Sequence, residues 1–151
     1  MPAYDPATFD PRNTIPGLVA RLRMAWLDEL DGRLAPYDLK AQDYIVLLMV
    51  ATGSDTASSI CSVLAHDPGA MTRKLDGLEK RGLVRRVRSE EDRRTIKLEL
   101  TPEGKKLYPK ALAEAVGLAN DFLQGFSKAE VKSLEGLLKR ILENAEAKAH
   151  Q

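Results

Sequence analysis

The apolar residues of this chain recur every three or four positions over long stretches, which is the spacing of an amphipathic helix. Residues 13–34 follow this spacing, and residues 39–51 form an almost wholly apolar segment, which predicts a helix buried on several sides. Four more helices are predicted over residues 56–65, residues 67–81, residues 102–125 and the segment from residue 127 onward. The pattern therefore predicts a mainly helical protein.

Several predicted helix ends carry residues that satisfy unpaired backbone groups. Asp67 is suited to cap the helix that follows it, and Pro68 suits the first helical position because its missing N–H would have no partner there. Gly82 ends the same helix. At the start of the last helix, Ser127 and Glu130 have the spacing of a capping box.

Residues 83–88 and 95–100 have the pattern of two short strands joined by a charged turn. In the second segment, Ile96, Leu98 and Leu100 alternate with polar residues, which is typical of a half-buried strand. Two helices joined by a short turn and followed by such a strand pair form a helix-turn-helix with a wing. The predicted fold class is thus mainly α with a small antiparallel β-wing.

The last helix carries an apolar seam whose members are three and four positions apart. A helix with such a seam and polar flanks needs a partner helix. The seam residues that we assign to dimerisation are Val131, Leu134, Leu138 and Ile141.

The whole-chain charge of +1 hides a concentrated positive segment. Residues 72–97 contain ten Lys or Arg against five Asp or Glu, whereas residues 1–71 have an excess of acids and residues 98–151 are neutral. A local excess of positive charge is the electrostatic footprint of a protein that binds a polyanion. Because this segment coincides with the predicted helix-turn-helix and wing, the expected polyanion is double-stranded DNA.

A helical wheel of residues 68–81 separates an apolar inward face from an outward face that begins with small residues. Thr72 can contact a thymine methyl group or a polar base edge, and Arg73 can make a bidentate contact with guanine. Lys74 and Lys80 are expected to meet phosphates. The alternative is a simply solvated helix face, and the adjacent basic wing favours DNA. The predicted DNA-binding residues are Gly69, Ala70, Thr72, Arg73, Lys74, Lys80, Arg86, Arg88, Asp92, Arg93 and Arg94.

The turn between the two strands carries arginines at the tip of a hairpin. An arginine in this position is suited to enter the narrow minor groove, where the negative potential is strongest. Asp92 is expected to orient Arg94 through a charge-assisted hydrogen bond. Glu90 and Glu91 are interpreted as solvated turn residues.

The ordered run TRKLDGLEKRGLV, DRR and LTPEG closely resembles the MarR family of bacterial winged-helix transcriptional regulators, and the resemblance covers nearly the whole chain. The D-x-R motif of that family's wing falls on Asp92 and Arg94. The resemblance implies a homodimer on a palindromic operator, repression of neighbouring genes, and a small aromatic or anionic ligand that releases DNA. It also implies dimerisation through the first helix, for which we name Ile15, Leu18 and Leu22.

The resemblance divides the chain into three expected regions within a single compact domain. They are an arm and dimerisation helix over residues 1–36, a winged helix-turn-helix over residues 37–101, and C-terminal dimerisation helices over residues 102–151. For a ligand pocket between them the sequence offers one cation and three aromatic residues, of which some can equally be core. These candidates are Arg23, Trp26, Tyr37 and Tyr44.

Other classes of function find less support in the sequence. Cys61 is the single cysteine, so no internal disulfide can form, and this fits a reducing, cytoplasmic location. We interpret Cys61 as a small buried hydrophobe; the alternative is a thiol redox switch. A winged-helix module for protein interaction is a second alternative, which does not explain the arginines of the wing. His66 and His150 are too scattered to suggest a metal site, and no cofactor is expected. The sequence contains no catalytic motif. No segment resembles a membrane span.

Overall fold

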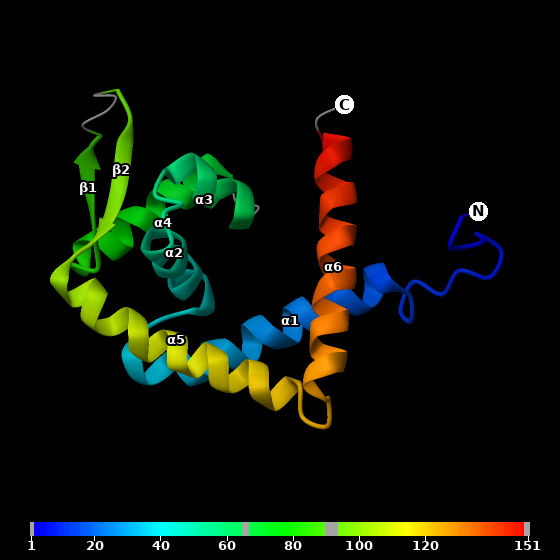
Figure 1. Ribbon diagram of the computed structural model, residues 1–151. Coiled ribbons are helices and arrows are strands. Elements are labelled where there is room, and N and C mark those ends of the chain that lie inside the picture. The colour runs from blue at the N-terminus through cyan, green and yellow to red at the C-terminus, as the bar shows by residue number, and fades with distance from the viewer. Residues whose placement is uncertain (1, 65–66, 90–93, 150–151) are drawn as a thin grey trace. The chain divides into compact units, whose positions relative to one another are not determined.

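The computed structural model describes residues 2–64, 67–89 and 94–149 (Figure 1). The chain divides into two compact units, residues 1–118 and 119–151, and the helix α5 runs from the first into the second. The helices are α1 (Ile15–Leu34), the short 3-10 helix η1 (Ala35–Tyr37), α2 (Ala41–Ala51), α3 (Ala57–Leu64), α4 (Pro68–Lys80), α5 (Pro102–Phe122) and α6 (Lys128–Ala149). The strands are β1 (Val84–Arg88) and β2 (Ile96–Leu100). The mainly helical fold with a two-stranded antiparallel wing is confirmed.

The core of the first unit is built around α2, as its almost wholly apolar sequence predicts. Seven of the eleven residues of α2 are buried, and α2 contacts α1, α3 and β2. The first part of α5 also contributes buried residues (Ala111, Ala115 and Leu118), so the boundary between the two units lies within α5, after Leu118.

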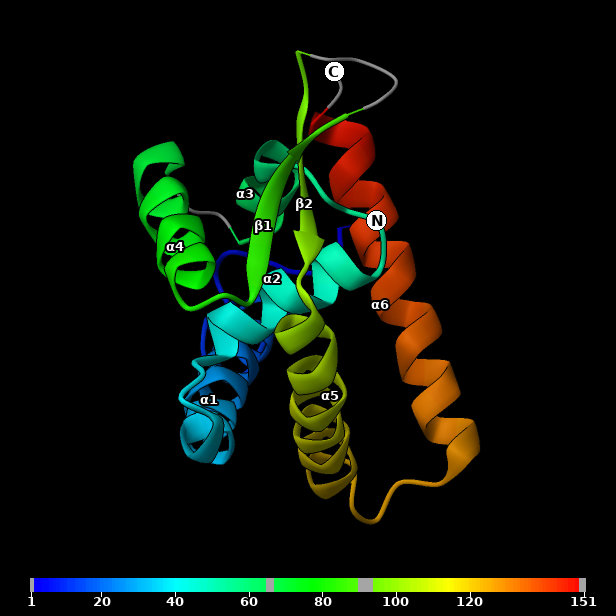
Figure 2. The same cartoon turned by 90° about the vertical axis from the view of Figure 1, so that its left-hand side faces the viewer.

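The wing is a hairpin that projects beyond the helices α3 and α4 (Figure 2). Its strands pair antiparallel, with Val84 opposite Leu100 and Arg88 opposite Ile96. A further connection ties the hairpin to the loop before α3, where Leu98 donates its backbone N–H to the carbonyl of Asp55 at 2.7 Å. This isolated bridge, in which Thr56 lies opposite Lys97, leaves no pattern in the sequence.

The predicted ends of α4 agree with the structure, whereas the helix predicted over residues 102–125 ends at Phe122. The Asp67 carboxylate accepts a hydrogen bond from the backbone N–H of Ala70 at 3.0 Å, and Pro68 lies in the first turn of α4. Gly82, after the end of α4, has a φ of +69°, a conformation that favours glycine. These two ends fix the length of α4, which packs against α3 and β1.

Two apolar residues within the periodic segments are exposed. Val63 of α3 is 63% exposed, because α3 buries only Ile60 and Leu64. Ile96 is 54% exposed, because it lies at the end of β2 that is far from the core. Periodicity identified the correct elements at both positions, but it does not tell where the core ends.

The second unit contains α6, which begins with the predicted capping box. The Ser127 backbone N–H donates to Glu130 Oε2 at 2.8 Å, and the Glu130 backbone N–H donates to Ser127 Oγ at 3.3 Å. These hydrogen bonds lower the pKa of the Glu130 carboxyl group, chiefly through the backbone N–H of Ser127. The apolar residues along α6 are exposed to solvent within this chain; they are Leu134, Leu137, Leu138, Ile141 and Leu142.

Candidate nucleic-acid interface

The helix α4 presents one exposed face over its whole length. Met71, Leu75 and Leu78 are buried on the inner side, as predicted. The exposed side carries Gly69, Thr72, Arg73, Asp76, Gly77 and Lys80. A Cβ atom added at Gly77 would meet no atom within 4 Å, so the helix is open to solvent at this position. Such a face can approach the edges of bases in a major groove.

Three of the predicted DNA-binding cations are exposed and make no ion pair within the residues that the structure describes. They are Arg73 and Lys80 on α4 and Arg88 at the end of β1. The Arg73 charge contributes to lowering the pKa of the Asp67 carboxyl group, although the backbone N–H of Ala70 is the larger cause. These three guanidinium and ammonium groups are therefore available to phosphates or base edges.

Other cations of the same positive segment are neutralised within the fold. Arg85 Nη2 lies 2.6 Å from Glu99 Oε2 across the strand pair. Arg86 turns toward α4, where its guanidinium contacts Asp76 Oδ1 at 2.7 Å and Glu79 Oε2 at 2.5 Å. Glu79 also accepts the backbone N–H of Arg86 at 3.0 Å, so Arg86 joins the wing to α4.

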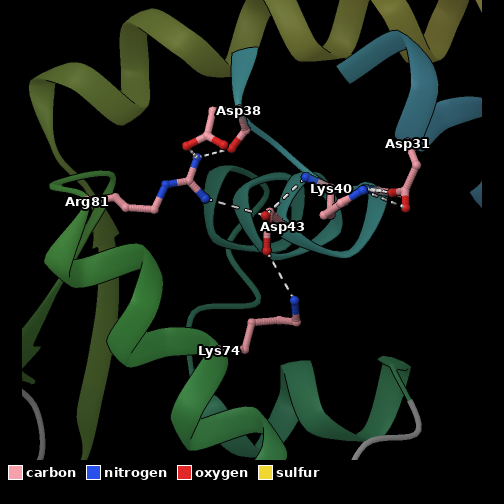
Figure 3. Close-up of polar contacts among 7 residues, drawn as sticks. Asp31, Asp38, Lys40, Asp43, Lys74 and Arg81 are labelled. Atoms are coloured by element: carbon pink, nitrogen blue, oxygen red, sulfur yellow. Dashed lines mark hydrogen bonds and ion pairs between the residues drawn. The ribbon is translucent and has the colours of Figure 1, made fainter. Parts of the chain in front are cut away.

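Lys74 lies on the inner side of α4 and contacts a carboxylate of α2 (Figure 3). Its ammonium is 3.1 Å from Asp43 Oδ1, and only 20% of the side chain is exposed. Asp43 Oδ2 also forms an ion pair with Arg81, whose Nη1 lies 3.5 Å away. Lys74 and Arg86 are thus held by ion pairs within the protein, and their contacts with DNA remain predictions.

The tip of the wing is only partly described by the structure. Arg94 is exposed, next to the start of β2. Asp92 and Arg93 lie outside the described residues, and so does the expected hydrogen bond from Arg94 to Asp92. Both remain predictions.

The four ligand-binding candidates occupy different environments. Tyr44 is 6% exposed within the core, and burial raises the pKa of its hydroxyl group. Tyr37 donates its hydroxyl hydrogen to Glu114 Oε1 at 3.3 Å. Trp26 is half-buried against the core, and Arg23 is exposed on α1. Tyr44 is better explained as core, whereas the other three reach the surface at least in part.

A cavity of about 750 Å³ lies between α3 and α4. Its lining includes Cys61, Met71 and Thr72, so it opens next to the exposed face of α4. Cys61 is half-buried there and packs against the core, in keeping with its interpretation as a small hydrophobe. The thiol switch remains a hypothesis.

The residues assigned to dimerisation are exposed on α1 and α6 within this chain. Ile15, Leu18 and Leu22 of α1 are each about half exposed, and Leu134, Leu138 and Ile141 of α6 are about two-fifths exposed. Val131 is half-buried. Among the described residues, no cluster of three metal-ligating side chains is found, and none of the described helices combines the length and apolarity that crossing a membrane requires.

The acidic partners of the positive segment were not singled out from the sequence. Asp43, Asp76, Glu79 and Glu99 pair with cations of this segment, and only Asp43 left a signal, as the one charge inside a largely apolar helix. A carboxylate in that position is rarely buried without a partner. The cation that reaches it could not be deduced from spacing.

Comparison with known proteins agrees with this geometry. Residues 37–95 match the model of the MarR family. The chain is 32% identical to the multiple antibiotic resistance protein MarR of Salmonella typhimurium, over 75% of this chain and 80% of that protein. The crystal structure of the transcriptional regulator PA3341 is 35% identical and has a TM-score of 0.81, covering 89% of this chain and 99% of that one.

A crystal structure of a mutant E. coli MarR in complex with operator DNA is also similar, with 27% identity and a TM-score of 0.74. The similarity covers 89% of this chain and 99% of that chain. With a relative above 30% identity matched over four-fifths of its length, and with the winged helix-turn-helix observed, the chain belongs to the MarR family of DNA-binding transcriptional regulators.

Proposed function

We propose that this protein is a homodimeric repressor that binds a palindromic operator through α4 and the wing. In this proposal, a small aromatic or anionic ligand releases the protein from DNA. The proposal of DNA binding rests on one observation, the different placement of the cations of α4. Arg73 and Lys80 face outward without an ion pair in the described structure, whereas Lys74 forms an ion pair with Asp43. The E. coli relative crystallised with operator DNA supports the same assignment.

In this proposal, Arg73 and Thr72 contact base edges in the major groove, and Lys80 and Arg88 contact phosphates. Arg94 enters the adjacent minor groove. Arg86 acts by holding the wing against α4 through Asp76 and Glu79 and does not touch DNA.

The dimer is supported by exposed apolar residues on two helices. Apolar side chains that are two-fifths to one-half exposed line both α1 and α6, and a surface of that kind is typical of a region that another chain covers. A second copy of the chain would present a second α4, which matches the two half-sites of a palindrome.

The ligand response is the part of the proposal that depends most on the family. Arg23 can pair with a carboxylate, and Trp26 and Tyr37 offer aromatic surfaces in or near α1. The Tyr37 hydroxyl group already bonds Glu114, so a ligand that competes for Tyr37 would alter a contact between η1 and α5.

The test is a titration of the purified protein against DNA from the region upstream of its own gene, at two salt concentrations, with and without salicylate-like aromatic acids. We expect specific binding that weakens steeply with salt and is abolished by the acids. Specific binding that the acids leave unchanged would contradict the ligand assignment alone. Weak binding without sequence preference would contradict the operator assignment.

A further inference from the structure

Asp43 caps the start of α2 and also contacts two cations of α4, so that it joins the two helices. We propose that Asp43 is a positioning residue, which holds α4 through Lys74 and Arg81 and so sets the orientation of the face that reads the operator. This inference rests on the proposed function, in which α4 enters the major groove.

The two contacts lie two turns apart along α4. Lys74 is within the helix and Arg81 is its C-terminal cap, so the anchors are separated by seven residues, or about 10 Å along the axis. Both converge on one carboxylate, with Lys74 Nζ at 3.1 Å from Oδ1 and Arg81 Nη1 at 3.5 Å from Oδ2 (Figure 3). Two anchors at this separation restrain both the tilt and the rotation of a helix, whereas one would restrain neither fully.

Asp43 is itself fixed from the other side. Its Oδ2 accepts the backbone N–H of Lys40 at 3.0 Å at the start of α2, and the residue is 8% exposed. The same turn is tied to α1, because the Asp31 carboxylate accepts the backbone N–H of Ala41 at 2.6 Å. The carboxylate therefore cannot follow a movement of α4.

Arg81 extends the connection to the turn before α2. Its guanidinium also donates to the backbone carbonyl of Asp38 and lies 3.4 Å from the Asp38 carboxylate. Asp38 has a φ of +53°, a left-handed conformation that Asp tolerates better than most residues. The end of α4 is thus also fastened to the turn that precedes α2.

A buried ion pair of this kind contributes little net stability, because taking both charges out of water offsets most of their attraction. It does impose a specific geometry at Lys74, because a carboxylate accepts good hydrogen bonds only over a narrow range of distances and angles; the 3.5 Å contact of Arg81 is a looser ion pair. Lys74 and Arg73 are neighbours on one helix, with Lys74 turned inward and Arg73 outward. A contact that fixes Lys74 therefore also sets the direction in which Arg73 points.

The experiment uses the full-length protein and the upstream DNA fragment that the wild type prefers. The variants are Asp43→Asn, the double variant Asp43→Asn with Lys74→Met, and Asp43→Glu, which keeps the charge. Asp28→Asn is the matched control, because it removes one carboxylate from an exposed position on α1. Operator affinity, affinity for unrelated DNA, the salt dependence of binding and thermal melting are measured for each.

We expect Asp43→Asn and the double variant to bind the operator about tenfold more weakly, which is the scale of one lost base contact. Affinity for unrelated DNA and the slope of affinity against salt should stay at wild-type values, because no phosphate contact is removed. The double variant leaves no charge on either side of the Asp43–Lys74 contact and so should remain folded. Asp43→Glu should recover part of the loss, and the control should bind like the wild type.

The inference is overturned if the double variant melts cooperatively and binds the operator like the wild type. It is also overturned if affinity for operator and unrelated DNA fall equally with a shallower salt slope, since Lys74 would then be a phosphate contact. If the wild type itself prefers no fragment, the proposed function fails first, and this inference fails with it.

Discussion

The contact between the wing and α4 through Glu79 provides a prediction whose size can be worked from the structure. Glu79 Oε1 accepts the backbone N–H of Arg86 at 3.0 Å, and Glu79 Oε2 lies 2.5 Å from the Arg86 guanidinium. Loss of the backbone hydrogen bond costs about 1 kcal/mol. The ion pair adds at most about 1 kcal/mol, because 29% of the Arg86 side chain and 39% of the Glu79 side chain are exposed to screening water.

Changing Glu79→Ala should therefore lower the free energy of unfolding by about 1–2 kcal/mol. For a chain of this length, the melting temperature should fall by about 2–8 °C. Changing Glu79→Gln should have a smaller effect, because the amide oxygen can still accept the backbone N–H of Arg86 while the ion pair is lost. Thermal melting followed by far-UV circular dichroism measures both variants.

Glu146→Ala is the control for the general effect of placing alanine in a helix, since Glu146 is exposed on α6 and makes no ion pair in the described structure. The reasoning is refuted if Glu79→Ala melts within about 1 °C of the wild type, or if Glu79→Gln is destabilised as much as Glu79→Ala. In the first case the wing would be held by other contacts, and in the second the ion pair would dominate.

Three further predictions concern other parts of the chain. Gly104→Ala should destabilise the fold by about 2 kcal/mol or more, because an added Cβ would lie 2.1 Å from the carbonyl oxygen of Leu83; a melting curve like that of the wild type would contradict this. Leu138→Glu together with Ile141→Glu should give monomers in sedimentation experiments, and dimers would exclude α6 from the interface. The backbone N–H of Ala70 lowers the pKa of the Asp67 carboxyl group below its ordinary value of 3.8. The stabilisation from this cap is therefore present at neutral pH and is lost as the pH falls through the lowered pKa. Asp67→Asn, which can still cap the helix, should remove this part of the acid sensitivity in melting experiments.

The elements of the fold could be predicted because each is determined by local pattern. The spacing of Met71, Leu75 and Leu78 identifies the inner face of α4, and Asp67 and Gly82 mark its ends. These signals depend on residues within two turns of each other. The agreement extends to the capping box of α6, for the same reason.

The sorting of the positive segment could not be predicted, because it depends on contacts between distant residues. Lys74 and Asp43 are 31 positions apart, and Arg85 meets Glu99 only once the strand register is set. Counting charges identified a positive segment, but it treated every cation as available. The extent of the core at Val63 and Ile96 was missed for a similar reason, since periodicity shows which side of an element faces inward and not how far the neighbouring elements reach.

The central claim is that some cations of the positive segment contact DNA, whereas others form ion pairs within the protein. The most direct measurement compares operator affinity for Arg73→Ala and Arg85→Ala, two changes that each remove one arginine from the same positive segment. Arg73→Ala should weaken binding by about 1–3 kcal/mol, the scale of a good contact between arginine and a base. Arg85→Ala should leave affinity within about twofold of the wild type, because Glu99 already neutralises Arg85 at 2.6 Å and only an exposed ion pair is lost. Equal losses for the two variants would contradict the account, since the positive segment would then act only through its total charge.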